Sequence, residues 1–536
     1  MLTPGCFNLY NCFIVVLLCT AQAFRRVCYF TNWSCDLLEP AAHFCISDID
    51  PAYCSHLIYA FANINTTTLE LSPTRPDDIG LKGGIPRYQK FNDFKLQYPE
   101  LKTLLSVGGS LQQSLGFSKV VESARSRTDF SQRAVEYLRK WNFDGLDLDW
   151  EYPGDPPATK RNYTLLLHDL RLQFADEARK SGRERLLLSI AAPVSPEKRE
   201  KGFQVENVAR EVDFINLMAY DFFGGWNKIA GFNSPLFGRN SDPRFSPMMN
   251  VEWTVNQWIL NGADRQKLTV GIAGYGVGYT LTNDTNYAVG AKVVGPGEKG
   301  PYRHMEGQLA YYEICELFEN ATYKWDPVQK SPYAYIEDQW VGFDNNRSVA
   351  EKVNWMVLQN LGGVMLWSLD LDDFKGTFCK NGKFPLLKSI HEAVAKHFPE
   401  IIITTTTPTT ITTTEDTTTM PTTISTTTTE STTTMTSEIP TGNDVLPRST
   451  TPNVKTTKDM GEIDNRPDWE PINTKPPYED NKTSDEDEID DRFDERENMI
   501  DDKIKRQPVA AKSGSNELVL SSFCFGAVFG IWTLTK

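Results

Sequence analysis

The chain has 536 residues, more than one ordinary domain requires, and its 40% hydrophobic residues, with 12 tryptophans, can supply a large core. The formal net charge of -15 is unevenly spread, because the segment 479–502 alone holds 13 acidic and 3 basic residues. The rest of the chain is only mildly acidic, which argues against nucleic acid as a partner.

The first 23 residues have the pattern of a secretion signal. An apolar run from Phe13 to Leu18 precedes Ala21-Gln22-Ala23, which is a small-x-small cleavage pattern. We therefore expect residues 1–23 to be a signal peptide and the mature chain to begin at Phe24, outside the cell. Sequons for N-linked glycosylation, which fit secretion, occur at Asn32, Asn65, Asn162, Asn283, Asn320, Asn346 and Asn481.

Eight short β-rich apolar runs alternate with helical stretches from Arg26 onward, which predicts an α/β fold with a parallel sheet closed into a (β/α)8 barrel. The strands are expected at residues 27–30, 56–62, 103–107, 145–150, 186–191, 214–220, 268–272 and 363–367. Helical patterns cover residues 129–141, 161–181, 348–361 and 385–397. Extra length at about residues 278–344 predicts an insertion between the seventh and eighth strands.

Carboxylates alternate with large apolar residues in the fourth of these strands. Because successive side chains of a strand point to opposite faces, Asp147, Asp149 and Glu151 share one face. Three crowded carboxyl groups cannot all ionise cheaply, so one of them is expected to hold a proton. A neutral carboxylic acid beside a carboxylate suits glycosidase chemistry, in which a leaving-group oxygen is protonated. The alternatives are a metal-binding acidic strand and a run of solvated charges in a loop.

The same stretch matches a family signature. Asp144, Asp147, Asp149 and Glu151 form the pattern D-x-x-D-x-D-x-E, which resembles that of glycoside hydrolase family 18, the chitinases and their relatives. Similar strings occur at residues 28–33, 56–61, 106–109, 218–221 and 367–373. The resemblance extends from Val27 to about His397, which implies one catalytic domain over residues 24–400, with a small α+β domain in the insertion that deepens the groove.

The resemblance implies an endochitinase that acts on chitin or chito-oligosaccharides by retaining, substrate-assisted hydrolysis. Glu151 would be the general acid and then the base, Asp149 would hold the acetamido N–H and stabilise the oxazolinium, and Asp147 would set the protonation of Asp149. Tyr220 would bond the acetamido oxygen, and Trp367 would lie under the sugar. The other expected substrate-binding residues are Tyr29, Phe61, Gly108, Gly109, Tyr152, Met218, Ala219 and Asp221.

Several further expectations accompany this function. Asp144 lies out of phase with the other acids and is predicted to be structural, and Gly145 lets the backbone enter the strand tightly. The reaction needs no metal or other cofactor, the His residues show no metal-ligand spacing, and we expect a monomer.

Two departures from the family pattern keep a second function open. Ser110 and Leu111 stand where chitinases usually have Trp-Asn, and Val277 stands where they usually have Arg. These changes bear on subsite affinity and on the preferred chain length. The rival functions are a lectin-like member of the family, although such relatives usually lose the catalytic Glu, and an endo-acting β-N-acetylglucosaminidase.

Six cysteines remain between the leader and the C-terminal tail, and an even set in a secreted chain suggests disulfides, with buried free thiols as the alternative. The family resemblance implies that Cys28 pairs with Cys54 and Cys315 with Cys379. Cys35 and Cys45 are then the remaining pair.

The composition changes beyond the catalytic domain. Residues 401–442 are rich in Thr and are predicted to be a mucin-like linker, and residues 443–517 are predicted to be an acidic disordered region. Residues 518–536 contain an apolar run from Leu518 to Leu534, which resembles the signal for a glycolipid (GPI) anchor, with a transmembrane helix as the alternative. Either would tether the chain to the outer face of a membrane.

The tether can be tested on intact cells with phosphatidylinositol-specific phospholipase C. We expect the phospholipase to release the protein into the medium, because a glycolipid anchor contains the bond that the phospholipase cleaves. Full retention, together with a detectable C-terminal epitope tag on the cells, would contradict the anchor and support the transmembrane alternative.

Overall fold

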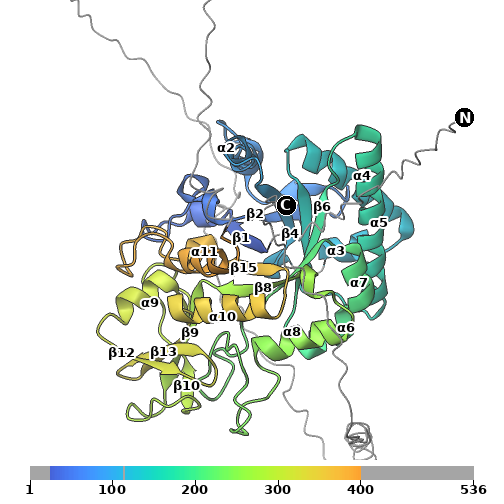
Figure 1. Ribbon diagram of the computed structural model, residues 1–536. Helices are drawn as coiled ribbons and strands as arrows, with labels where there is room; N and C mark the ends of the chain where they lie inside the picture. The colour runs from blue at the N-terminus through green and yellow to red at the C-terminus, as the bar shows by residue number, and fades with distance from the viewer. Residues whose placement is uncertain (1–23, 113–114, 400–536) are drawn as a thin grey trace, which may run out of the picture. The chain divides into compact units, whose positions relative to one another are not determined.

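The computed structural model describes residues 24–112 and 115–399 (Figure 1). The predicted signal peptide, Thr-rich linker, acidic region and apolar tail lie outside the described residues. Within the described ranges, no helix is both long enough and apolar enough to span a membrane.

Eight parallel strands close into the predicted barrel. They are β1 (Arg25–Thr31), β2 (His56–Ile64), β4 (Lys102–Gly108), β5 (Gly145–Asp149), β6 (Leu187–Ala192), β7 (Phe214–Leu217), β8 (Leu268–Ala273) and β15 (Gly363–Trp367). Closure occurs at β1, which pairs with β2 on one side and with β15 on the other. The short strand β3 (Leu71–Pro73) pairs antiparallel with the end of β2. The strands are apolar because a barrel strand is covered on both faces.

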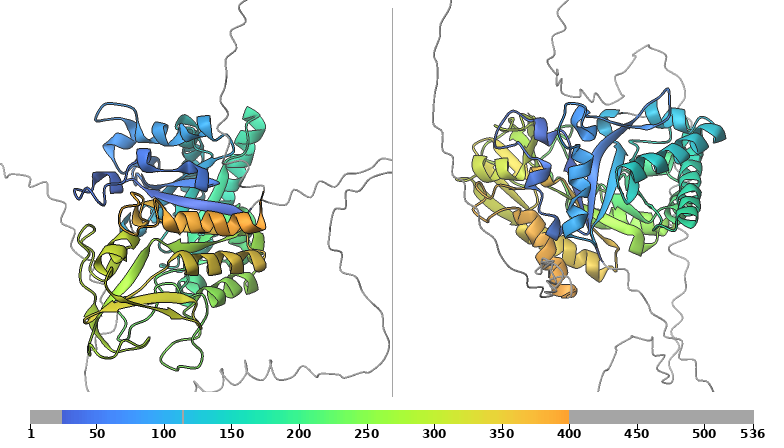
Figure 2. Two further views of the ribbon diagram at one scale, coloured as in Figure 1. Left: turned by 60° about the vertical axis from the view of Figure 1, so that its left-hand side comes forward. Right: turned by 90° about the horizontal axis from the view of Figure 1, so that it is seen from above.

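Helices surround this barrel, and Figures 1 and 2 show α4, α5 and α7 together on one side of it, with α10 and α11 on another. The helices of the barrel layer are α1 (Arg87–Asn92), α2 (Phe94–Gln97), α3 (Leu115–Val120), α4 (Ala124–Lys140), α5 (Ala158–Ser181), α6 (Pro196–Gly202), α7 (Val205–Glu211), α8 (Val251–Leu260), α10 (Asn346–Leu358) and α11 (Pro385–His397). All four predicted helices are present, and α11 has the predicted bounds. Helix α4 begins earlier than predicted, because the Ser123 hydroxyl caps it by accepting a hydrogen bond from the Ser126 N–H.

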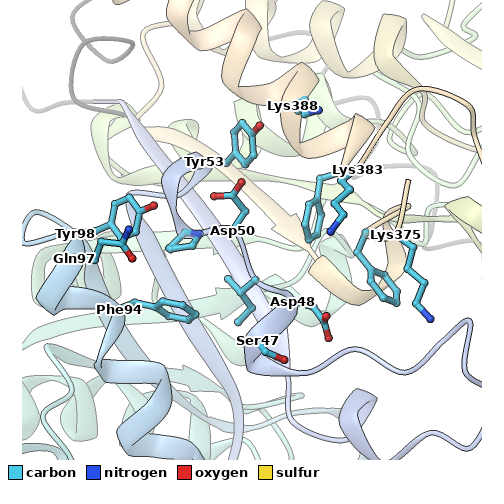
Figure 3. Close-up of a pocket in the computed structure, with 14 residues that line it drawn as sticks. Ser47, Asp48, Asp50, Tyr53, Phe94, Gln97, Tyr98, Lys375, Lys383 and Lys388 are labelled. Carbon is cyan, nitrogen blue, oxygen red and sulfur yellow. The ribbon is translucent and has the colours of Figure 1, made fainter. Parts of the chain in front are cut away.

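The connection from β1 to β2 contains short 3-10 turns in place of a long helix. These turns are η1 (Ser34–Asp36), η2 (Ile46–Asp48) and η3 (Pro51–Tyr53). A pocket of about 690 Å³ lies between this connection, α2 and the start of α11 (Figure 3). Charged side chains line it, among them Asp50 and Lys388, and none of its lining residues is a predicted site residue.

The insertion between the seventh and eighth barrel strands is an α+β unit, as predicted. Its antiparallel sheet comprises β9 (Tyr275–Leu281), β10 (Val293–Pro296), β11 (Gln308–Ala310), β12 (Thr322–Asp326), β13 (Ser331–Ile336) and β14 (Gln339–Gly342), accompanied by α9 (Tyr311–Leu317). Strand β9 starts at Tyr275, directly after β8 and three residues before the predicted start of the insertion. The added sheet therefore begins at the carboxyl end of the barrel, where the chemical residues are expected.

The three predicted disulfides are confirmed as Cys28–Cys54, Cys35–Cys45 and Cys315–Cys379. The first of the predicted sequons is not available for modification in the folded chain. The side chain of Asn32 is 1% exposed, and its amide nitrogen donates to Thr74 Oγ1 (2.7 Å) and to Asp78 Oδ2 (3.0 Å).

Asp144 holds the entry of β5 in place. Its Oδ2 accepts hydrogen bonds from the Thr103 N–H (2.8 Å) and from Lys95 Nζ (3.0 Å), which join β5 to β4 and to α2. We expect Asp144→Asn to lower the free energy of unfolding by about 1–2 kcal/mol, because a hydrogen bond between charged groups is lost. Urea unfolding measures this loss.

Asp93→Asn is the matched control, because Asp93 is exposed and its side chain makes no cap hydrogen bond. An unfolding curve of Asp144→Asn that coincides with that of the control would contradict a structural role for Asp144.

Candidate active site

The acidic face of β5 points into the barrel, and its apolar face points outward. Asp147 and Asp149 are buried at 0% and 4% exposure, and Asp149 is the last residue of the strand. On the outer side, the ring of Trp150 stacks on Phe117, with centroids 5.1 Å apart, and meets Tyr163 edge to face. The strand alternation predicted from the sequence therefore separates the acidic residues from the helix-facing core.

Asp147 is held by hydrogen-bond donors from four other strands. The donors are Tyr29 OH (2.9 Å) and Ser106 Oγ (2.7 Å) on Oδ2, and Ser189 Oγ (2.7 Å) and Asn216 Nδ2 (3.3 Å) on Oδ1. Burial raises the pKa of Asp147, and these hydrogen bonds oppose the rise because they favour the ionised form. Asp147 is thus a carboxyl group with a fixed position, two residues before Asp149 on the same face of β5.

The carboxyl groups of Asp149 and Glu151 both have raised pKa values. Burial is the largest cause that raises the pKa of Asp149 well above its ordinary value, followed by the negative charges of Glu151 and Asp147. Burial also raises the pKa of Glu151, where a hydrogen bond from Tyr152 opposes the shift and the charge of Asp221 adds to it. The pair therefore holds a proton more readily than two solvated carboxyl groups do.

One oxygen of this pair has no partner within the described residues. Asp149 Oδ1 is buried and accepts no hydrogen bond. Buried polar atoms are nearly always paired, so this atom is a position where a ligand could supply the donor.

Two glycines bring the backbone of β4 close to the acidic strand. Gly108 has φ +114°, and a Cβ there would lie 2.1 Å from the carbonyl oxygen of Asp149. Gly109 has φ +86°, and a Cβ there would lie 2.6 Å from the ring of Phe61. The Gly109 N–H also donates to the Asp149 carbonyl (2.9 Å), so these residues support the acid through the backbone.

Strand β7 ends at Leu217, whereas the sequence predicted a strand to Tyr220. The N–H groups of Ala219 and Tyr220 donate to carbonyls only two residues back, those of Leu217 and Met218, so the backbone turns out of the sheet. The turn places Tyr220 beside the acids, and the sequence did not reveal it because residues 218–220 are as apolar as a strand.

Tyr220 and Asp221 lie next to the acidic pair. Burial, followed by the charges of Asp221 and Asp149, raises the pKa of Tyr220 far above its ordinary value, so its hydroxyl remains protonated. Asp221 has φ +57°, and its N–H donates to Asn233 Oδ1 (2.8 Å). The Asp221 side chain is exposed to solvent, yet desolvation by the surrounding protein raises its pKa. A hydrogen bond of 2.5 Å from Tyr275 OH to Asp221 Oδ1 lowers this pKa and so opposes the rise.

Aromatic rings from β1, β2 and β15 pack together near the acids, and the hydroxyl of one of them, Tyr29, donates to Asp147. Trp367 packs on Tyr29, with ring centroids 5.3 Å apart, and on Phe61 at 5.8 Å. Trp33 extends the group, because its ring lies 5.9 Å from Phe61 and 6.4 Å from Trp367. We call these four residues the aromatic cluster. Trp367 and Trp33 are half-buried, so each presents part of an apolar surface.

The structure adds residues to the site that the sequence reasoning did not select. Ser106, Ser189 and Asn216 complete the surroundings of Asp147, and Asn233 positions Asp221. The sequence marks Ser106, Ser189 and Asn216 only as polar residues within apolar strands. Trp33 lies within one of the strings noted above but was not predicted to be a site residue.

The two departures from the family pattern occupy different environments. Ser110 is exposed, and the neighbouring Leu111 is 63% exposed. Val277 is 2% exposed and lies in β9, where it pairs with Gln308 and Gly342. An aliphatic side chain at this position cannot donate the hydrogen bonds of an arginine.

The acids do not form a candidate metal site. Among the residues that the structure describes, the group whose ligand atoms all lie within 4.8 Å of one another is Cys35, His43 and Cys45. Its two sulfur atoms are joined in a disulfide, so they are not thiolate ligands.

An acid pair beside aromatic rings, at the carboxyl end of a (β/α)8 barrel, is an arrangement suited to cleaving glycosidic bonds. Comparison with known proteins agrees with this class. The model of glycosyl hydrolases family 18 matches residues 25–372, and the chain belongs to that family.

Its relatives include chitinases and chitinase-like proteins. Chitotriosidase-1 of Mus musculus is 41% identical over 374 residues, which are 69% of this chain and 78% of that protein. Chitinase-3-like protein 2 of Homo sapiens is 40% identical over 383 residues, or 71% of this chain and 95% of that protein. The structure of human YKL-39, described as a pseudo-chitinase with retained chitooligosaccharide binding properties, matches with a TM-score of 0.65 at 40% identity, covering 70% of this chain and all of that one.

The raised pKa of Asp149 predicts how stability depends on pH. A raised pKa in the folded state contributes stability below the ordinary pKa of Asp, and this contribution is lost as the pH rises through the folded-state pKa. Asparagine does not titrate. The melting temperature of Asp149→Asn should therefore rise relative to that of the wild type as the pH increases above about 4, the ordinary pKa of Asp. Thermal unfolding at a series of pH values measures this difference in melting temperature, with Asp93→Asn as the control. A difference that shrinks as the pH rises would contradict the prediction.

Proposed function

We propose that the protein is an endochitinase that hydrolyses β-1,4-linked N-acetylglucosamine polymers with retention of configuration. The observation that carries the proposal is the buried, unpaired Oδ1 of Asp149, next to Glu151 on the acidic face of β5, with burial raising the pKa of both carboxyl groups. This oxygen would accept the N–H of the substrate's 2-acetamido group. Chemistry that uses the acetamido group restricts the substrate to N-acetylhexosamines.

Glu151 donates the proton that the leaving-group oxygen requires. Its raised pKa keeps it protonated near neutral pH more often than a solvated glutamic acid, which is the condition for general acid catalysis. As the glycosidic bond breaks, the acetamido oxygen attacks the anomeric carbon and forms an oxazolinium ion. Glu151, now ionised, then takes a proton from the water that opens this ion.

The remaining residues orient the acetamido group and stabilise the positive charge. Asp149 stabilises the positive charge of the oxazolinium in its ionised form, and the negative charge of Asp147, which raises the pKa of Asp149, influences when Asp149 gives up or takes back its proton. The protonated hydroxyl of Tyr220 donates to the acetamido oxygen. Trp367 gives the sugar ring an apolar surface, and the packing of Trp367 on Tyr29 and Phe61 keeps that surface in place.

A chitooligosaccharide-binding protein without turnover is the second candidate. It is favoured by exposed Ser110 and buried Val277, which replace a ring and a cation expected to bind substrate. The related structure of human YKL-39, described as a pseudo-chitinase with retained chitooligosaccharide binding properties, also favours this candidate. Release of product from a chromogenic chito-oligosaccharide decides between the two functions, and activity on N-glycoproteins but not on chitin would indicate an endo-β-N-acetylglucosaminidase.

The proposed site of action is outside the cell, where chitin is accessible. Three disulfides fit an oxidising compartment. The tether predicted from residues 518–536 would hold the catalytic domain at the cell surface, as a monomer and without a nucleic acid partner.

The central prediction concerns Glu151→Gln. This variant keeps the shape of the side chain but cannot donate an acidic proton, so kcat should fall by about two to four orders of magnitude while substrate binding persists. Hydrolysis of a chromogenic chito-oligosaccharide measures kcat, and calorimetry measures binding.

Glu122→Gln, at an exposed position, serves as the control. A Glu151→Gln enzyme with the wild-type rate would overturn the mechanism. Wild-type protein that binds the oligosaccharide without product release would instead establish the binding function.

A further inference from the structure

The Cys35–Cys45 disulfide lies in the loop that follows β1, next to the aromatic cluster. Cys35 comes two residues after Trp33, whose ring packs on Phe61 and lies near Trp367. Both sulfur-bearing residues are half-buried and therefore accessible to small molecules.

A histidine lies against this disulfide. His43 is exposed, and its Nε2 is 3.1 Å from Cys45 Sγ and 4.0 Å from Cys35 Sγ. Its Nδ1 is 3.3 Å from the Leu37 carbonyl oxygen. An imidazolium in this position donates one N–H to the carbonyl and directs the other at Cys45 sulfur. A positive charge beside a sulfur stabilises the thiolate, so Cys45 is the better leaving group of the pair.

The other two disulfides lack this arrangement. Cys28 and Cys54 are 1% and 5% exposed, so an attacking thiol cannot reach them in the folded chain. Cys379 Sγ lies 3.9 Å from the carbonyl oxygen of Tyr311, whose negative end disfavours a thiolate. In the described part of the chain, no hydrogen bond joins an imidazole to either of these pairs.

We propose that Cys35 is a site of reversible modification by low-molecular-weight thiols. The thiolate RS⁻ attacks Cys35 Sγ, the Cys35–Cys45 bond breaks, and an RS–Cys35 bond forms while the electron pair leaves on Cys45 Sγ. His43 stabilises that thiolate or gives it a proton. One sulfur–sulfur bond replaces another, so no external oxidant or reductant is needed, and attack by Cys45 on the mixed disulfide restores the original bond.

The surrounding packing confines the change to the loop. Ser34 and Phe44, which directly precede Cys35 and Cys45, are both fully buried, and Ser34 Oγ lies within hydrogen-bond distance of the carbonyl oxygens of Thr31 (2.6 Å) and Phe44 (2.9 Å). The ends of the loop therefore remain attached to β1 when the disulfide opens. The modified thiol adds a polar group near Trp33 and should weaken binding of the oligosaccharide there, a consequence that rests on the proposed function.

The test uses reduced glutathione as the thiol and the intact protein. After timed incubation, acid quenching and alkylation, peptide mass spectrometry locates each adduct. We expect one glutathione on Cys35 and an alkylated Cys45, with exchange at least about tenfold faster than at the other two disulfides. His43→Ala should slow the exchange several-fold, whereas His397→Ala, which changes an exposed histidine on α11, should not.

Three outcomes would each overturn the proposal: equal exchange at all three disulfides, an adduct mainly on Cys45, or an unchanged rate in His43→Ala. A double variant, Cys35→Ser with Cys45→Ser, shows by its melting temperature whether the loop folds without the bond. Because the adduct is detected by mass, its absence is distinguishable from absence of hydrolysis.

Discussion

The arrangement of the site depends on the burial of one carboxyl group, that of Asp147, inside the barrel. Four donors from β1, β4, β6 and β7 hold it, so it links strands that are far apart in the chain. The negative charge of Asp147 then acts on Asp149, which accepts no hydrogen bond at Oδ1 and whose pKa is raised by burial and by the charges of Glu151 and Asp147. The polar core of the barrel and the acid chemistry at its end are therefore one electrostatic system.

The backbone serves this system as much as the side chains do. Gly108 and Gly109 let β4 approach Asp149 and Phe61 at distances that any Cβ would prevent. The turn after Leu217 carries Tyr220 and Asp221 out of the sheet and toward the acids. These features place an acid pair, a neutral hydroxyl and an aromatic surface together at the carboxyl end of the barrel.

Much of this could be predicted from the sequence, because the informative signals are local. The eight apolar runs and the alternation from Asp147 to Glu151 each reflect short-range physics, whereas the disulfide pairing and the roles of the site residues were implied by the family resemblance. The residues that hold Asp147 were not found, because a single Ser189 or Asn216 in an apolar strand shows no partner until the barrel closes. The contact of His43 with Cys45 could not be predicted either, because it depends on the path of the loop that follows β1. The end of β7 was misplaced because the residues of its turn are apolar.

The start of β9 at Tyr275 has a consequence for exchanging parts between barrels. Tyr275 opens the added sheet, yet its hydroxyl donates to Asp221 and its carbonyl accepts from Asn233 Nδ2. The insertion is therefore not a cassette that can be removed or swapped at the ends of β8 and β15. A chimera that joins this barrel to the added domain of a relative would need a junction beyond Tyr275, so that the recipient keeps its own support for Asp221.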